Sequence, residues 1–141
     1  LGDIALTAAS AHFTSAYSAV GLTPDGGASW WLPRLIGMRR AQEMIFTNRR
    51  IGAEEAAGMG LVTRVVADDR LRTEASAVAS TLAKGPIRAL ARCRSLLVES
   101  INADLSTQLD REAASIAESA GAAEGREGVA AFLAKRPPHF V

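Results

Sequence analysis

Three long helical patterns, separated by short breaks, fill the second half of the sequence. Apolar residues recur at helical spacing over residues 87–102, 104–120 and 124–134. Before them, short apolar stretches of strand character alternate with short helical patterns. The chain therefore divides by pattern into a mixed α/β part, residues 1–70, and a helical part, residues 71–141.

The mixed part predicts several short elements between glycine, proline and asparagine positions. The patterns favour strands at 4–9 and 61–66, a brief extended piece at 10–13, and helices at 29–36, 38–47, 53–57 and 70–84. Pro33 fits the first of these helices only near its start, because proline lacks the N–H that the helix interior requires. Asp68 and Asp69 are candidate N-caps for the last one.

The composition is typical of a folded domain and does not indicate a membrane protein or a nucleic-acid-binding protein. Of the 141 residues, 48% are hydrophobic and 22% are charged, and the formal net charge is +1. This balance argues against disorder and gives no basis for a nucleic-acid surface. No apolar run approaches the roughly 20 residues of a membrane span, no signal peptide is recognisable, and no metal, flavin or nicotinamide motif is present. We expect a soluble, cytoplasmic protein with no membrane or nucleic-acid partner.

The most unusual local feature is a carboxylate set between a proline and two glycines, in the segment 24–27. Pro24 has a restricted φ, while Gly26 and Gly27 permit conformations that other residues resist, so Asp25 is expected on a tight turn. Both tryptophans of the chain follow within six positions. Asp25 is therefore either a catalytic acid beside an apolar surface or the N-cap of the next helix. Residue chemistry alone favours the cap.

Several segments in order resemble one enzyme family. They are Ala8-Ala9-Ser10-Ala11-His12-Phe13, Gly21-Leu22-Thr23-Pro24-Asp25-Gly26-Gly27, Leu32-Pro33-Arg34-Leu35-Ile36-Gly37, Arg40-Ala41-Gln42-Glu43-Met44, Ala53-Glu54-Glu55-Ala56, and the ending from Glu124 to Phe140. Together they resemble the enoyl-CoA hydratase/isomerase (crotonase) superfamily over essentially the whole chain. No single segment is decisive, but their shared order and spacing make the resemblance strong.

The resemblance implies a fold, a substrate class and an assembly. It implies an α/β crotonase-like spiral of ββα units, here only its C-terminal part, followed by a helical trimerisation region. It also implies an acyl-CoA substrate, bound as a coenzyme A thioester with no other cofactor, and a homotrimer or dimer of trimers. Two backbone N–H groups form the family's oxyanion hole, which stabilises the thioester enolate.

Two departures from the family pattern limit what this chain does. The resemblance covers only the C-terminal half of a member, and the run Leu1-Gly2-Asp3-Ile4 is typical of a domain interior. The oxyanion-hole segments and the first glutamate of hydratases therefore belong before Leu1. Tyr17 stands where hydratases carry their second glutamate, so water addition by that route is not expected.

Asp25 stands where hydratases usually have glycine. In the phenylacetate-type isomerases that this chain resembles, an aspartate at this place shuttles a proton, whereas in 4-chlorobenzoyl-CoA dehalogenase it is the nucleophile. We therefore expect an acyl-CoA isomerase with Asp25 as its proton shuttle, beside an apolar wall of Tyr17, Trp30 and Trp31. One alternative is a dehalogenase- or thioesterase-type reaction with nucleophilic Asp25. The other is a truncated, inactive oligomerisation module.

The resemblance also suggests residues that contact substrate. They are Tyr17, Gly21, Pro24, Trp30, Lys135 and Phe140. Lys135 is placed to meet a CoA phosphate as a point charge. A solvated lysine before the Pro137-Pro138 stop is the competing interpretation, and Phe140 is equally suited to packing.

Overall fold

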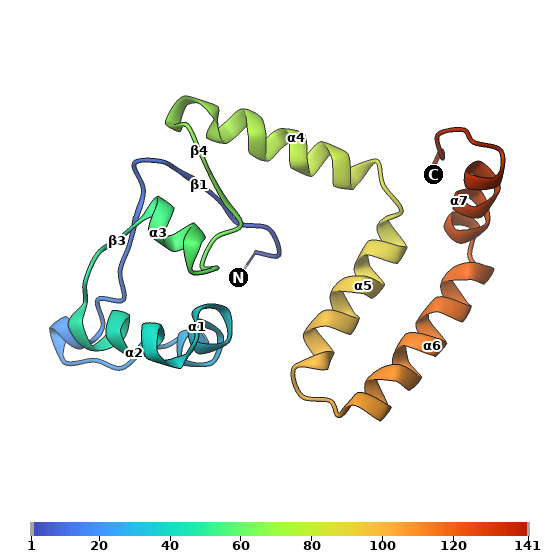
Figure 1. Cartoon of the computed structure of the whole chain (residues 1–141). Coiled ribbons are helices and arrows are strands. Elements are labelled where there is room, and N and C mark those ends of the chain that lie inside the picture. The colour runs from blue at the N-terminus through green and yellow to red at the C-terminus, as the bar shows by residue number, and fades with distance from the viewer. Residues whose placement is uncertain (1, 141) are drawn as a thin grey trace. The chain divides into compact units, whose positions relative to one another are not determined.

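A computed structural model describes residues 2–140 and shows two units, which are described separately (Figure 1). The first unit ends at Ser76 and the second begins at Ala77. Leu1, which opens the apolar run at the start of the chain, lies outside the described residues.

Two small sheets organise the first unit. Strand β1 (Leu6–Ala8) pairs in parallel with β4 (Arg64–Val66), and β2 (His12–Phe13) pairs antiparallel with β3 (Ile51–Gly52). All four strands are short. The predicted strands at 4–9 and 61–66 are confirmed in place but begin later than expected.

The core of the first unit lies under three helices, α1 (Ala28–Ile36), α2 (Met38–Thr47) and α3 (Ala53–Gly58). Ala41 and Met44 turn inward from α2, which confirms its predicted apolar face. Ile51 of β3 is fully buried, with 0% exposure. The buried cluster consists of Ile36, Ala41, Met44, Ile51, Ala56, Met59 and Val62.

Two local predictions were wrong. Pro33 lies inside α1, past its first turn, so the carbonyl of Ser29 loses its helical N–H partner. The two aspartates Asp68 and Asp69 do not cap a helix. They begin a 3₁₀ turn, η2 (Asp68–Arg70), before α4 (Leu71–Ala83), and Oδ1 of Asp68 instead accepts from the Ser10 backbone N–H at 3.0 Å.

The second unit contains α5 (Ile87–Ser100), α6 (Leu105–Gly121) and α7 (Ala123–Leu133), as the three helical patterns predict. Asp104 caps α6, because its Oδ1 accepts from the Thr107 backbone N–H at 2.9 Å. Gly125 follows the tight α6–α7 corner. A Cβ at Gly125 would lie 2.0 Å from the Ser119 carbonyl oxygen, so only glycine fits there.

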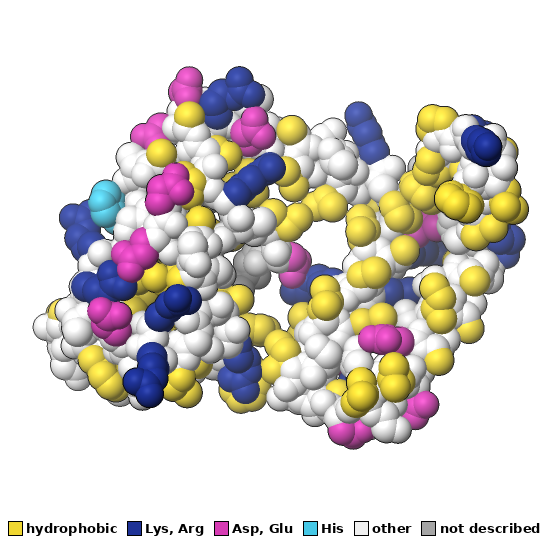
Figure 2. All heavy atoms as spheres, in the orientation of Figure 1, with side chains coloured by type: hydrophobic (Ala, Val, Ile, Leu, Met, Phe, Trp, Pro, Cys, Tyr) yellow, Lys and Arg dark blue, Asp and Glu magenta, His cyan; other side chains and the backbone are white. Residues whose placement is uncertain are grey.

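These three helices leave most of their large apolar side chains exposed (Figure 2). Leu105 and Leu109, one turn apart on α6, are 74% and 54% exposed, and Phe132 of α7 is 81% exposed. The apolar stripes that predicted the helices therefore do not form a closed core within this unit. Among residues 2–140, no helix combines the length and apolar character that a membrane crossing needs.

Candidate active site

The segment from Tyr17 to Asp25 is built from two consecutive tight turns. A 3₁₀ turn, η1 (Ser18–Val20), follows Tyr17, and Gly21 closes it in the left-handed region with φ of 74°. The Leu22 N–H then donates back to the Tyr17 carbonyl at 3.0 Å. This folding-back brings Asp25 to the side chain of Tyr17, eight residues earlier. Gly21 and half-buried Pro24 thus shape the turn.

Asp25 and Tyr17 are joined directly. The Tyr17 hydroxyl donates to Oδ1 of Asp25 at 2.7 Å. This hydrogen bond and the nearby negative charge raise the pKa of Tyr17 above its ordinary value of 10.0, so the phenol stays a donor at neutral pH. Tyr17 was expected as part of an apolar wall, but its contact with the carboxylate is polar.

The Asp25 side chain does not cap α1, so the cap hypothesis was wrong. Helix α1 has Gly27 as its N-cap and no side-chain cap bond. Only the Asp25 main chain takes part, its carbonyl accepting from the Ala28 N–H at 2.9 Å. Asp25 is exposed, and within the described part of the chain its Oδ2 has no hydrogen-bond partner. One carboxylate oxygen is therefore held by Tyr17, while the other makes no hydrogen bond within the described residues of this unit.

The tryptophans lie just after this turn and have different surroundings. The Trp31 ring packs against Gly27, with Cδ1 3.4 Å from where a Cβ would stand. Trp30 is exposed, and the Arg34 guanidinium stacks over its ring at 3.5 Å from the centroid. Arg34 also donates to the Trp30 carbonyl at 3.0 Å. One face of the Trp30 ring is therefore already covered, a contact that the i, i+4 spacing within α1 permits.

A hydrogen-bond cluster that the sequence analysis missed anchors the segment on both sides of Tyr17. Thr14 Oγ1 donates to the Asn48 carbonyl at 3.0 Å, and Ser18 Oγ lies 3.0 Å from Asn48 Oδ1 and 2.5 Å from the Ile45 carbonyl. These contacts connect positions about thirty residues apart. The only local signal is an asparagine after a helix, where a left-handed residue is common.

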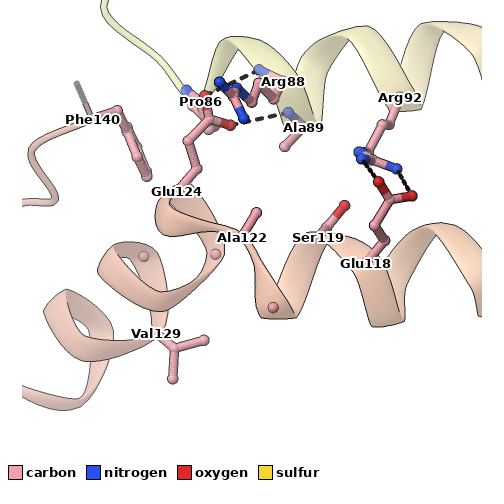
Figure 3. A pocket seen from close by; sticks show the side chains of 13 residues that line it. Pro86, Arg88, Ala89, Arg92, Glu118, Ser119, Ala122, Glu124, Val129 and Phe140 are labelled. Atoms are coloured by element: carbon pink, nitrogen blue, oxygen red, sulfur yellow. Dashed lines mark hydrogen bonds and ion pairs between the residues drawn. The ribbon is translucent and has the colours of Figure 1, made fainter.

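Lys135 and Phe140 lie in the second unit, on the tail that follows α7. Lys135 is exposed and adopts a left-handed backbone with φ of 51°. Phe140 lines a pocket of about 540 Å³ formed by α5, α6, α7 and the tail (Figure 3). Its ring lies 3.7 Å from where a Cβ of Gly128 would stand, so the absence of a side chain at Gly128 leaves room for it.

The two carboxylates that line this pocket, Glu118 and Glu124, each accept hydrogen bonds. Arg92 makes two hydrogen bonds to the Glu118 carboxylate, and the Glu124 carboxylate accepts from the Arg88 and Ala89 backbone N–H groups, both at 3.1 Å (Figure 3). Glu124 thereby satisfies N–H groups at the start of α5, where a negative charge is favoured.

The tail that carries Phe140 is tied down by Glu127. The Glu127 carboxylate accepts two hydrogen bonds from Arg136, at 2.7 and 2.8 Å, and one from the His139 N–H at 2.8 Å. The Arg136 hydrogen bonds and the His139 N–H lower the pKa of Glu127 from 4.5 to about 2. Sequence reasoning assigned Glu127 no such role, because its partners lie beyond the end of its own helix.

The chain belongs to the enoyl-CoA hydratase/isomerase family, whose sequence profile matches residues 1–141. Among curated relatives it is 44% identical over 138 residues to a Rhodobacter capsulatus protein named "Probable enoyl-CoA hydratase" (98% of this chain and 54% of the relative). It is 39% identical to the 1,2-epoxyphenylacetyl-CoA isomerase of Escherichia coli (99% and 53%). It is also 30% identical to a 4-chlorobenzoyl coenzyme A dehalogenase of Arthrobacter sp (94% and 48%).

Solved structures agree with the family assignment. The crystal structure of an enoyl-CoA hydratase from Polaromonas sp. JS666 superposes with a TM-score of 0.94 at 36% identity, over 99% of this chain and 54% of that one. The chain thus spans about half the length of the relatives it matches. Its fold is the C-terminal part of the crotonase fold, as the resemblance predicted.

Proposed function

We propose that the protein is an acyl-CoA isomerase in which Asp25 moves a proton beside the CoA thioester. The carboxylate removes a proton alpha or gamma to the thioester carbonyl and becomes a carboxylic acid. The bonding electron pair moves into the thioester enolate, and Asp25 then returns the proton at the other carbon. The double bond changes position with no net gain or loss of atoms. The proposal takes its oxyanion donors from the part of the family fold that these 141 residues do not include.

The contact between Tyr17 and Asp25 is the observation that supports this proposal most. A proton shuttle needs a carboxylate with one oxygen free and with a fixed direction, and the 2.7 Å hydrogen bond to Oδ1 supplies that direction. Tyr17 also replaces the carboxylate that a hydratase would use at this place. The substitution removes a general base for water and provides a neutral donor instead.

Replacing Asp25 in the full-length protein tests the proposal. Asp25→Asn keeps the shape of the side chain but removes its basicity, and turnover of a 3-enoyl-CoA should fall by a factor of about 10²–10⁴. Asp69→Asn, an exposed aspartate of η2 in the same unit, is the matched control and should retain activity. Activity of Asp25→Asn within a few-fold of the parent would contradict the assignment.

A nucleophilic Asp25 is the second candidate, favoured by the identity to the dehalogenase and by the free Oδ2. In that reaction the carboxylate forms an aryl ester as halide leaves, or a mixed anhydride with the acyl group as CoA thiolate leaves, and water then hydrolyses the covalent intermediate. Mass spectrometry of the protein quenched during turnover distinguishes the two candidates. An adduct on Asp25 supports the nucleophile, and its absence during rapid turnover supports the proton shuttle.

Assembly and CoA binding belong to the same proposal. The exposed apolar faces of α6 and α7 support a homotrimer or a dimer of trimers, because monomeric proteins rarely leave large apolar patches exposed to water. Lys135 and Phe140 are proposed to contact CoA, with Trp30 near the acyl group. Sedimentation of the full-length protein tests the assembly, and an oligomerisation module without activity would assemble but not turn over a thioester.

A further inference from the structure

The backbone of Asn48 is held in a conformation that few residues adopt. Asn48 is the C-cap of α2, with φ of 53° and ψ of 24°, and is one of two residues other than glycine with positive φ among residues 2–140. Asparagine tolerates this region better than most side chains. The left-handed turn lets both its carbonyl and its side chain reach the segment 14–18.

Asn48 holds that segment at both ends. Thr14 reaches the Asn48 carbonyl at 3.0 Å, and Ser18 lies 3.0 Å from the Asn48 side-chain amide. Ser15, between them, is only 5% exposed, so the segment is also seated against the interior. Tyr17 stands within this short stretch, directly before Ser18.

The Ser18 hydroxyl lies between two acceptors at the end of α2. A serine hydroxyl has one proton to donate, and the Ile45 carbonyl, at 2.5 Å, is the nearer acceptor. Asn48 Oδ1, at 3.0 Å from Ser18 Oγ, is the second acceptor. One carbonyl at the end of α2 thereby gains a donor, and the Ser18 side chain is held beside Asn48.

Asn48, Thr14 and Ser18 together are called the Asn48 clamp. Arg49, the residue after Asn48, connects this clamp to the rest of the unit. Arg49 donates to both oxygens of Glu55, at 3.0 and 2.5 Å, and its Nε lies 3.3 Å from Glu43. Arg49 thereby ties α2 to α3 at the point where Asn48 turns. Hydrogen bonds and peptide bonds together connect Glu55 of α3 through Arg49, Asn48 and Ser18 to Tyr17, and the Tyr17 hydroxyl connects to Asp25.

We propose that Asn48 is a positioning residue for the proton shuttle: through Ser18 and Thr14 it fixes Tyr17, and Tyr17 fixes the direction of the Asp25 carboxylate. This inference rests on the proposed function of Asp25 for its catalytic consequence. The geometric consequence, the placement of the Tyr17 hydroxyl on Asp25, is independent of the reaction and can be measured without it.

Two variants in the full-length protein test the clamp. Asn48→Gly keeps the left-handed backbone and removes the amide, so α2 retains its C-cap geometry. Ser18→Ala removes the hydroxyl from the other side. The control is Ser100→Ala in α5, where Ser100 Oγ likewise donates to a helix carbonyl, that of Leu97, at 2.8 Å. Far-ultraviolet circular dichroism checks that each variant is folded.

The first readout is the ionisation of Tyr17, the one tyrosine in this sequence. Its absorbance titration is isolated by subtracting that of Tyr17→Phe, which removes any tyrosine outside the 141 residues. In Asn48→Gly and Ser18→Ala the titration should move to lower pH, because the Tyr17 hydroxyl lies less closely on the carboxylate. Ser100→Ala should leave it in place. An unchanged titration in both folded clamp variants would overturn the inference.

The second readout separates this inference from the proposed function. With an intact shuttle, both clamp variants should lower kcat by about 10- to 100-fold while KM changes little, because a misdirected base affects the chemical step. If Asp25→Asn retains activity but the Tyr17 titration moves to lower pH in the two clamp variants, the proposed function fails while the placement of Tyr17 by Asn48 is supported. If Asp25→Asn is inactive but both clamp variants keep the parent kcat, the positioning role is refuted.

Discussion

Gly27 makes the turn beside Asp25 possible, and its replacement has an effect that can be worked out from the structure. Gly27 is the N-cap of α1 and has φ of 82° and ψ of 10°. A residue with a Cβ loses about 1–2 kcal/mol in this left-handed conformation. The Cβ of Gly27→Ala would lie 3.4 Å from Trp31 Cδ1, at the edge of ordinary contact. The backbone term therefore dominates.

An opposing effect in the unfolded chain reduces this cost. Alanine restricts the unfolded state more than glycine does, which returns roughly 0.4–1 kcal/mol. The net loss for Gly27→Ala is then about 1 kcal/mol, or about a fivefold change in the folding equilibrium. With a urea m-value of about 1–3 kcal/mol/M, the unfolding midpoint should fall by about 0.3–1 M.

Urea unfolding of the full-length protein, followed by tryptophan fluorescence, measures this shift. Gly52→Ala is the matched control, because Gly52 has φ of −73° and nothing lies within 4 Å of the added Cβ. It should be neutral or slightly stabilising. Gly27→Asn should lose less stability than Gly27→Ala, since asparagine adopts the left-handed region more readily. Equal midpoints for Gly27→Ala and Gly52→Ala would refute the reasoning.

Three further predictions concern the core and the two charged contacts. Ile51→Ala should lower the free energy of unfolding by about 2–5 kcal/mol, measured by urea unfolding, because Ile51 has 0% exposure and its removal leaves a cavity. The pKa of Glu127 is lowered from 4.5 to about 2, so the stabilisation of the tail by the Glu127 carboxylate should be complete above pH 4.5 and lost as the pH falls toward 2. The NMR shift of the His139 amide follows this loss. Since the pKa of Tyr17 is raised above 10.0, its stabilising bond to Asp25 should persist below pH 10 and disappear as the pH rises through the raised value, followed by comparing unfolding midpoints with Tyr17→Phe.

Each of these predictions has an outcome that contradicts it. Ile51→Val, which removes one methylene, should cost only about 0.5–1.5 kcal/mol, so an equal loss for valine and alanine would argue against a cavity. A His139 shift with the same acid midpoint in Glu127→Gln would show that another group holds the tail. A constant difference between the parent and Tyr17→Phe across pH 9–12 would mean that Tyr17 does not ionise as described.

Periodicity predicted most of the helices, because each buried or contacting face recurs every three or four residues within one segment. Helix α2 matches its predicted range, 38–47, and Asp104 caps α6 just where the second long pattern begins. Local chemistry misjudged Asp68, whose carboxylate meets the Ser10 N–H across the sheet rather than its own helix. A cap signal carries no information about a partner 58 residues away.

The sequence predicted Asp25 as a candidate site residue but predicted neither its bond to Tyr17 nor the role of Asn48. Asp25 was singled out by its proline and glycine neighbours, and its role by family resemblance, but its bond to Tyr17 depends on two turns whose combined direction the sequence does not specify. Asn48 was missed because its contacts join the end of a helix to a loop thirty residues earlier. Such contacts arise from packing and leave no periodic pattern.

Removal of a substrate proton tests the central claim most directly. The full-length protein is incubated with a 3-enoyl-CoA that carries deuterium at the alpha carbon, and the loss of deuterium from that carbon is followed by nuclear magnetic resonance. Our account predicts rapid loss in the parent, whether the deuteron is returned at the gamma carbon or exchanges with water, and a rate lower by about 10²-fold or more in Asp25→Asn. Loss of deuterium in Asp25→Asn at the parent rate would show that another group moves the proton.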